Sequence, residues 1–202
     1  CQVAVTLSIA NHHASLPVAY RLYLPKDWAD DSKRRSKTGV PEAVCFKTKP
    51  EIALEQIEAA CKAELPRGVV LMDAGYGCNT DLRTGVSALG LRYVAGVLPN
   101  TSVWASGTGP LPPKKWSGQG RPPKLIRRDD KHRPISVKNL ALDLPKRAWR
   151  TIQWREGTAE WLSSRFARVR VRAAHRDDNL TEGRPEEWLL IEWPKGEDAP
   201  TK

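Results

Sequence analysis

The sequence Gly68-Val69-Val70-Leu71-Met72-Asp73-Ala74-Gly75-Tyr76-Gly77 joins a short apolar run to an acid and two glycines. Residues 69–72 are uniformly apolar, which predicts a strand buried on both faces of a sheet. Asp73 ends the run, and a carboxylate at the carboxyl end of such a strand lies where open α/β sheets place their chemistry. The glycines let the backbone turn sharply or approach a ligand closely. A simpler interpretation stays open, in which Asp73 only caps a turn before a helix that begins near Asp81.

Upstream, the pattern predicts an antiparallel hairpin and one long helix. Apolar residues alternate along 2–9 and again along 16–24, and a short polar turn separates the two strands. Residues 25–40 are polar and charged, which predicts a loop with one short helical turn. Thr48-Lys49-Pro50-Glu51 matches a capping box with proline in the first turn, so we expect a helix from there to about Glu64.

Downstream, a helix over 81–89 and a strand over 92–98 are expected, which makes two parallel strands joined by a helical crossover. Residues 1–100 therefore predict an α/β fold with a mixed sheet. Residues 105–135 are rich in Pro, Gly, Lys and Arg and predict a mobile loop without regular structure. The remainder of 101–202 predicts a small β-rich unit, with strands at 135–140, 150–154, 169–173 and 188–193 and a short helix at 159–166.

The composition is typical of a globular protein. The chain has 202 residues, 40% of them apolar, and no apolar run reaches the roughly 18 residues that span a membrane. Its four cysteines form no C-x-x-C pair, so we expect no zinc site and reduced, mostly buried thiols of a cytoplasmic protein. The chain does not begin with Met, and residue 3 already lies inside a strand-like pattern, so we interpret the chain as a piece of a longer protein.

Positive charge is concentrated in the second half of the chain. Residues 1–100 carry 12 Lys and Arg against 10 Asp and Glu, whereas residues 101–202 carry 21 against 13. Within 110–172 the corresponding counts are 17 and 5. A basic surface concentrated in one region is the electrostatic signature of a polyanion-binding protein. Tryptophans among these charges argue against a face that serves solubility alone.

Three separated stretches occur in a characteristic order, namely Asp73 with its glycines, Trp154-Arg155-Glu156-Gly157-Thr158, and Ser164-Arg165-Phe166-Ala167. Together they resemble bacterial insertion-sequence transposases of the DDE superfamily, in the branch whose motif near the third acid is of the Y-R-E-K type. The resemblance extends over the whole chain. It implies an α/β, ribonuclease H-like mixed sheet with a β-rich insertion, here incomplete with the first strand missing. Residues 1–100 are then a partial catalytic core, and residues 101–202 are the basic insertion.

The resemblance also implies three acidic residues that bind two divalent cations, Mg²⁺ or Mn²⁺, and that cut and join DNA strands. Asp73 matches the second acid. The third acid of the family lies in an R-x3-E-x6-K motif, which neither Trp154-Arg155-Glu156 nor any other stretch satisfies. We therefore expect the third acid beyond Lys202 and the first before Cys1. Glu156 is the best internal candidate for the third acid, and a structural ion pair is its alternative role.

One carboxylate does not hold two cations, so we expect the chain alone to be inactive and the intact transposase to cleave and transfer DNA strands. The resemblance implies a homodimer. DNA contacts are expected in the basic half, at Lys114, Lys115, Arg121, Lys124, Arg127, Arg128, Lys131 and Arg133. We expect Trp104 or Trp116 to stack on an unpaired base, and core packing for Trp149, Trp154, Trp188 and Trp193.

Two other interpretations stay open. The first is a non-catalytic nucleic-acid-binding remnant of a transposase, with the same fold and no chemistry. The second is a nucleotide-binding α/β enzyme that uses Gly75 and Gly77. The second is the weaker, because a G-x-G without the third glycine and a following acid is a poor fingerprint, and the hairpin at the start does not suit it.

Overall fold

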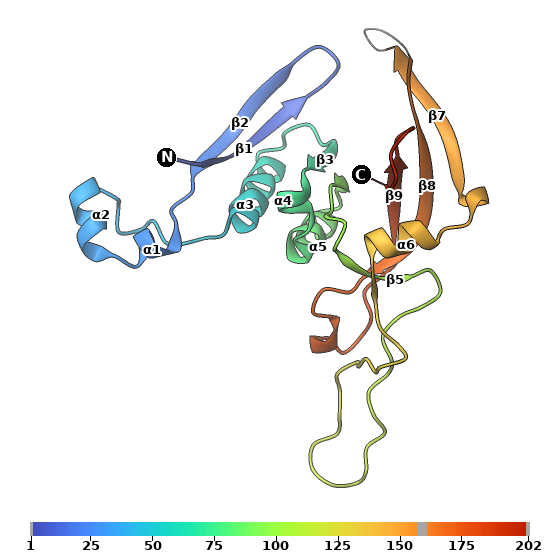
Figure 1. Cartoon of the computed structure of the whole chain (residues 1–202). Coiled ribbons are helices and arrows are strands. Elements are labelled where there is room, and N and C mark those ends of the chain that lie inside the picture. Colours follow the sequence, from blue (N-terminus) through green and yellow to red (C-terminus); the bar gives the residue numbers. More distant parts are fainter. Residues whose placement is uncertain (1, 157–160, 201–202) are drawn as a thin grey trace. The chain divides into compact units, whose positions relative to one another are not determined.

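The computed structural model describes residues 2–156 and 161–200 and divides the chain into two compact units, Cys1–Gly96 and Val97–Lys202 (Figure 1). Each unit has a hydrophobic core of its own. Among the helices of the described residues, none has the length and apolar character needed to cross a membrane.

The first unit opens with the predicted hairpin. Strands β1 (Ala4–Ala10) and β2 (Ser15–Leu22) pair antiparallel, with a register shift between Leu7 and Ser8. Asn11 closes the turn, because its side-chain oxygen accepts the backbone N–H groups of His13 and Ala14.

Two short helices follow where only one helical turn is expected from the sequence. They are α1 (Lys26–Ala29) and α2 (Ser32–Thr38). The Asp31 side chain caps α2 at its start, and Gly39, with φ of 67°, ends it in the left-handed conformation. The helix α2 has no buried residue and no apolar stripe, so only its caps could have revealed it.

The core of the first unit lies between helices and a two-stranded parallel sheet. Helix α3 (Lys49–Lys62) has the predicted capping box, in which the side chains of Thr48 and Glu51 each accept the other's backbone N–H. Strand β3 (Val69–Met72) pairs in parallel with β4 (Arg92–Ala95), as expected. Helices α4 (Ala74–Gly77) and α5 (Thr80–Ala88) connect them. Ile57, Leu82 and Val86 form the buried centre of this core.

The prediction that β3 is buried on both faces is wrong. Val70 and Met72 pack against the core, whereas the side chains on the other face are open, with Val69 45% and Leu71 75% exposed. Val94 on β4 is 63% exposed on the same open face. An apolar run therefore correctly predicts a strand here, but one of its faces has no cover within the described chain.

The second unit is a β-rich unit built around one long central strand. Strand β8 (Trp161–Ala173) pairs antiparallel with β5 (Ser102–Ala105), β7 (Trp149–Glu156) and β9 (Glu187–Trp193), and β6 (Ile135–Ser136) pairs with β5. Residues 165–167 pair with both β7 and β9, and Val171 pairs with both β5 and β9. Strands β5 and β7 therefore share one edge of β8, and β9 occupies the other.

Two element predictions in this unit are wrong. The expected helix at 159–166 is the start of β8 from Trp161 on, because that segment pairs along its length with β7. The expected strand at 135–140 is limited to β6, and helix α6 (Val137–Asp143) follows it. Ser136 caps α6, and Val137, Leu140 and Ala141 have the spacing of one buried helical face.

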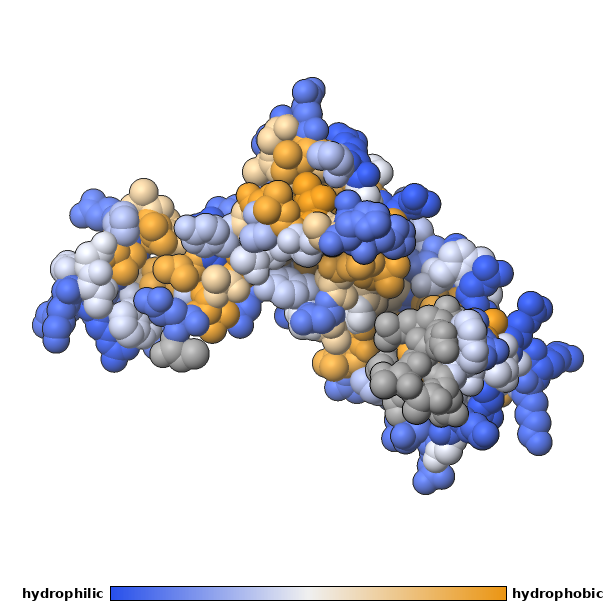
Figure 2. Space-filling view, turned by 90° about the horizontal axis from the view of Figure 1, so that it is seen from above, coloured by the Kyte–Doolittle hydropathy of each residue, from blue (hydrophilic) through white to orange (hydrophobic). Residues whose placement is uncertain are grey.

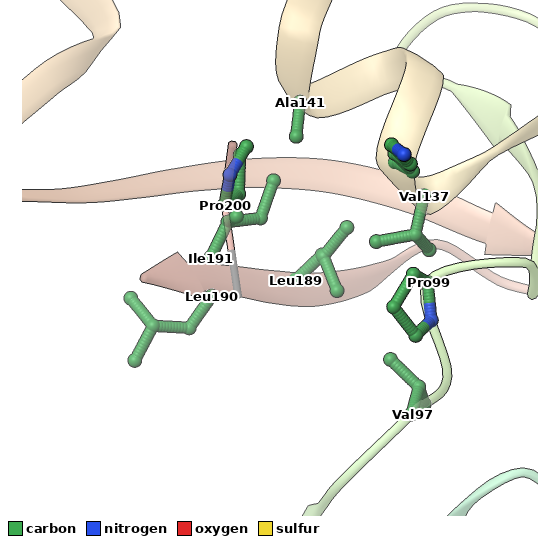
Figure 3. A pocket seen from close by; sticks show the side chains of 9 residues that line it. Val97, Pro99, Val137, Ala141, Leu189, Leu190, Ile191 and Pro200 are labelled. Carbon is green, nitrogen blue, oxygen red and sulfur yellow. The ribbon is translucent and has the colours of Figure 1, made fainter. Parts of the chain in front are cut away.

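Helix α6 covers one face of the sheet. Val137 and Leu140 pack against Val103 and Val171, and β9 contributes Leu189. Figure 3 shows a small apolar pocket at this contact, with Leu189 pointing toward α6 and Leu190 pointing away from it. Successive residues of β9 thus lie on opposite faces of the sheet, as the period of a strand requires.

The segment between β5 and β6 contains no helix or strand, as expected from its composition. Its base is attached to the rest of the unit by backbone hydrogen bonds, between Leu111 and Arg127 and from Ile126 N to Leu180 O (3.0 Å). The segment farther out extends away from the sheet (Figure 1). Two short 3₁₀ turns complete the unit, η1 (Lys146–Ala148) before β7 and η2 (Asp177–Asn179) after β8.

Candidate functional site

Asp73 follows directly on β3 and is exposed, at the carboxyl end of the strand. Its Oδ1 accepts the backbone N–H groups of Gly75 (2.9 Å) and Tyr76 (3.2 Å), so Asp73 is the N-cap of α4. Asp73 is therefore a helix cap, as the simpler interpretation states, and it uses one of its two carboxylate oxygens for this. Capping by itself leaves the carboxylate charge at a solvent-accessible strand end, where it can also act on a ligand.

The turn after Asp73 packs against the end of β4 at the distance of backbone contact. A Cβ added to Gly77 would lie 2.0 Å from the carbonyl oxygen of Gly96. Gly96 in turn donates its N–H to the carbonyl of Met72 (2.9 Å). Backbone packing thus explains Gly77, and the nucleotide-binding interpretation of the two glycines loses its main support.

Arg83 also holds this turn in place. It is only 7% exposed, and its guanidinium donates to the carbonyl oxygen of Gly77 and to the Thr80 hydroxyl. Sequence reasoning missed this residue, because an arginine on a short amphipathic helix normally points to solvent. Its position makes Arg83 a structural support of the Asp73 turn.

Tyr76 reports on the electrostatics of this site. Burial raises the pKa of the Tyr76 hydroxyl, and the negative charge of Asp73 raises it further. A nearby anion disfavours the phenolate, which is why the two effects have the same sign. The Asp73 carboxylate is therefore close enough to influence the side chain that follows it on α4.

The described residues do not by themselves form a two-cation site. Among them, no group of three or more His, Cys, Asp or Glu side chains gathers in one place. Asp73 supplies one carboxylate, and two divalent cations require several. Glu156 is the last residue of β7, and its side chain lies outside what the structure describes.

A hollow separates β1 from β3 in the first unit. It consists of two adjoining pockets that share Thr6, Leu7, Val70 and Leu71. Residues 6–10 and 68–71 line one pocket, and residues 5–7 and 70–73 line the other. Among the described strands, β1 pairs only with β2 and β3 only with β4, so each has an unpaired edge. The start of β1 lies near the end of β3, and the end of β1 near its start, so the two strands run antiparallel.

Gln56 on α3 lines this hollow and is 8% exposed. Its Nε2 donates to the carbonyl of Val5 (3.1 Å), and its Oε1 has no hydrogen-bond partner among the described residues. A buried amide oxygen without a donor costs free energy. The hollow therefore contains an acceptor suited to an N–H group.

The predicted DNA contacts lie on the segment between β5 and β6, residues 106–134, which we call the irregular segment. They differ in their surroundings. The exposed members without an ion pair to any described acid are Lys114, Lys115, Arg121, Lys124 and Lys131. Arg127 pairs with Asp129 (3.7 Å), and Arg133 pairs with Asp130. Five of the eight positions thus remain available as positive charges on an extended segment.

Arg128 has a structural contact instead. Its guanidinium pairs with Asp177, a carboxylate that is 1% exposed, and also donates to the carbonyl of Ala174. Trp104 Nε1 donates to the other oxygen of Asp177 (2.6 Å), and the ring of His132 lies 5.0 Å from that of Trp104. This buried network attaches the base of the basic segment to the sheet.

The tryptophans are distributed differently from the prediction. Trp104 is 2% exposed and engaged with Asp177, so it is not free to stack on a base, whereas Trp116 is 53% exposed. Trp149 and Trp193 contact each other edge to face at 5.2 Å. Trp188 is 58% exposed, contrary to the expected core position, and Trp154 lies where side chains are not described.

The thiols also differ from expectation, because Cys45 is exposed while Cys61 and Cys78 are only partly buried.

The first unit is a mixed α/β unit with an acid at a strand end, and this architecture is compatible with a ribonuclease H-like fold. Residues 1–160, which make up most of the chain, match the family described as DDE superfamily endonuclease. The chain therefore belongs to the DDE superfamily endonucleases. No curated protein and no solved structure matches it.

Proposed function

We propose that this chain is the central part of a DNA transposase and that Asp73 is a metal-binding carboxylate of its active site. The family match over residues 1–160 carries the proposal, and the exposed carboxylate at the end of β3 supports it. Mg²⁺ or Mn²⁺ would be the cation, because hard oxygen ligands select such ions. In the intact protein the activity is cleavage and transfer of DNA strands, in the cytoplasm and by a homodimer.

The remaining acids lie outside the described residues in this proposal. The first unit supports an incomplete sheet, because β1 and β3 have unpaired edges that face one hollow. One extended strand placed between them would pair with both edges and supply an N–H group to Gln56 Oε1. If that strand runs parallel to β3, its carboxyl end lies beside Asp73, where a first acid is needed.

The capping role of Asp73 allows a sharp test. Asn caps helices as well as Asp does, so Asp73→Asn in the full-length polypeptide retains the hydrogen bonds to Gly75 and Tyr76 while it removes the charge. We expect Mg²⁺-dependent DNA cleavage to be lost and DNA binding to be retained. Asp81→Asn, on an exposed acid in the first turn of α5, is the matched control and should cleave normally. Cleavage by Asp73→Asn at the normal rate would remove Asp73 from the active site.

A second assay tests the incomplete set of acids. The chain of residues 1–202 should not cleave DNA in Mg²⁺ or Mn²⁺, whereas a polypeptide extended in both directions should. Efficient cleavage by residues 1–202 would contradict this and would make Glu156 the first residue to substitute.

The basic second unit is proposed as the DNA-binding insertion, with contacts on the irregular segment. Neutralised phosphates release counterions, so the affinity should fall steeply as salt is raised. Replacing Lys114, Lys115, Arg121 and Lys124 together by Gln should reduce the slope of this dependence by about one for each basic residue replaced. An affinity that does not respond to salt would contradict the phosphate contacts.

The alternative is a non-catalytic DNA-binding remnant. This alternative is compatible with a site that contains Asp73 as its one described acid. It differs from the transposase in the result of the cleavage assay. A remnant binds DNA equally well before and after the Asp73→Asn substitution and shows no cleavage in any extended form, so the assays above separate the two.

A further inference from the structure

We propose that the face of the five-stranded sheet opposite α6 binds the phosphates of a DNA strand, through arginines projecting from β7 and β8. The inference rests on the proposed function only in taking DNA as the partner. It concerns residues outside the irregular segment, and we call the surface made by Arg150, Arg168, Arg170 and Trp188 the arginine face.

The period of a strand determines which arginines share a face. Val169 and Val171 pack in the core under α6, so Arg168 and Arg170, which alternate with them along β8, point to the opposite side. Trp188 lies directly across from Arg170 on β9 and shares its face. Arg150 lies across from Phe166 on β7, which places it diagonally beside Arg168.

Exposure shows that the part of this face around Trp188 is open. Trp188 is 58% and Leu190 61% exposed, and both Arg150 and Arg168 are exposed. No ion pair to an acid of the described residues involves Arg150 or Arg168. Two positive charges thus lie side by side on a sheet surface without neutralisation by a described carboxylate.

Trp188 orients the arginines. The guanidinium carbons of Arg168 and Arg170 lie 4.4 and 4.9 Å from the centre of its ring. Cation–π contact of this kind holds a flexible side chain in place and leaves its charge unneutralised. Residues two apart on a strand, such as Arg168 and Arg170, are about 7 Å apart. Diagonal neighbours on paired strands, such as Arg150 and Arg168, are about 7–8 Å apart. Both separations are comparable to that of successive phosphates along one DNA strand.

Acids also border the arginine face and limit its charge. Glu186 pairs with Arg170 (3.5 Å) and Arg172 (3.8 Å), so Arg170 is partly neutralised. Glu192 lies across from Phe166 and therefore on the same face as Arg168. Arg168 and Arg150 should consequently be the stronger phosphate contacts, and Glu192 should oppose binding.

The occupant is taken to be a phosphate backbone because of this charge and spacing. An unpaired strand and a duplex offer the same chemistry, so the experiment compares them. A second copy of the chain would instead use the apolar surface of Trp188 and Leu190, and the solution mass of the protein tests for it.

The experiment measures binding of the full chain to fluorescein-labelled single-stranded and duplex DNA of one sequence, by anisotropy, over a range of salt concentrations. The test variant is Arg150→Gln combined with Arg168→Gln. We expect weaker binding and a slope against log salt reduced by about two, one for each arginine replaced. Glu192→Gln should strengthen binding to the same DNA. The DNA form whose affinity changes more identifies the natural occupant.

Arg165→Gln provides the matched control. Arg165 lies on the same strand and also stacks on a tryptophan, Trp193 at 4.6 Å, but it projects from the opposite face. It should leave the salt slope unchanged. An equal effect of Arg165→Gln, or no effect of the double variant, would overturn the proposal. So would a double variant that alters the solution mass of the protein without altering DNA affinity.

These outcomes are distinct from failure of the proposed function. If the irregular-segment variants weaken binding and the double variant does not, the arginine face is wrong while the transposase assignment stands. If the unaltered chain binds neither form of DNA at any salt concentration, the DNA-binding part of the proposed function fails as well.

Discussion

At the scale of single residues, Gly77 has no room for a side chain. A Cβ there would lie 2.0 Å from the oxygen of Gly96 and 3.0 Å from the Cβ of Ala95. Backbone atoms cannot move aside as a flexible side chain does. We expect Gly77→Ala to displace α4 from β4 and to lower the free energy of unfolding by about 1–3 kcal/mol.

Urea denaturation measures this effect, and Gly68→Ala is the matched control. A Cβ at Gly68 meets nothing within 4 Å, so that variant should unfold at the same urea concentration as the parent or slightly higher. Equal midpoints for both variants would show that the close contact between α4 and β4 is not maintained in solution.

Arg128 and Arg133 form another informative pair of residues, because the sequence predicts the same DNA-binding role for both. Arg128 neutralises the buried Asp177, whereas Arg133 pairs with Asp130, whose side chain is 93% exposed. Arg128→Ala leaves a buried carboxylate without its partner, which costs about 3 kcal/mol in the free energy of unfolding. Arg133→Ala should cost less than about 1 kcal/mol. Thermal or urea denaturation distinguishes them, and equal losses would contradict the buried pair.

At the scale of elements, the capping box of α3 links stability to pH. Hydrogen bonds from the Thr48 hydroxyl and backbone N–H lower the pKa of Glu51 below its usual 4.5. Because the folded pKa is depressed, the stabilisation is complete above the unfolded value and is lost as pH falls through the folded one. Thr48→Ala should therefore cost about 1 kcal/mol at pH 7 and less at pH 3.

Denaturation midpoints between pH 3 and pH 7 provide the measurement. Glu51→Gln retains the geometry of the box but has no titrating group, so its midpoint should vary less with pH over this range than that of the parent chain. A Thr48→Ala penalty that is the same at pH 3 and pH 7 would show that Glu51 does not contribute through its charge.

The elements also show where sequence reasoning succeeds and where it fails. The hairpin, α3, β3, α5 and the parallel β4 follow from local patterns and caps, and the structure confirms them. Local patterns predict a helix at the start of β8 and fail there, because its strand state is fixed by pairing with β7 and β9. Helix α2 is not predicted because none of its residues is buried, so its sequence has no apolar stripe.

At the scale of the whole molecule, the unpaired edges of β1 and β3 carry a prediction for the longer polypeptide. A version extended before Cys1, so that it supplies a strand to the hollow, should be more stable, because a sheet edge gains hydrogen bonds and Leu71 gains cover. Hydrogen exchange should show slower amides in β1 and β3, and unchanged amides in β9 of the other unit. Unchanged exchange in β1 and β3 would mean that the hollow does not accept a strand.

Exposed apolar side chains occur in both units. Figure 2 shows apolar surface beside hydrophilic surface in the view from above. Leu16, Tyr20 and Leu71 in the first unit and Trp188 and Leu190 in the second are each more than half exposed. Contiguous exposed apolar surface commonly marks an interaction site.

The order of residues along the chain was enough to establish the class of the protein, the acid at the end of β3 and the concentration of positive charge in the second half. These depend on local patterns, such as an apolar run that ends in Asp73, and on counts of charge. Folding in three dimensions settled which of the predicted residues remain free, since Arg128 and Trp104 are engaged by Asp177 while Trp188 is exposed. It also settled that Gly77 serves backbone contact and that β1 and β3 retain open edges. The physical reason is that burial and ion pairing depend on partners distant in the chain, which local patterns do not identify.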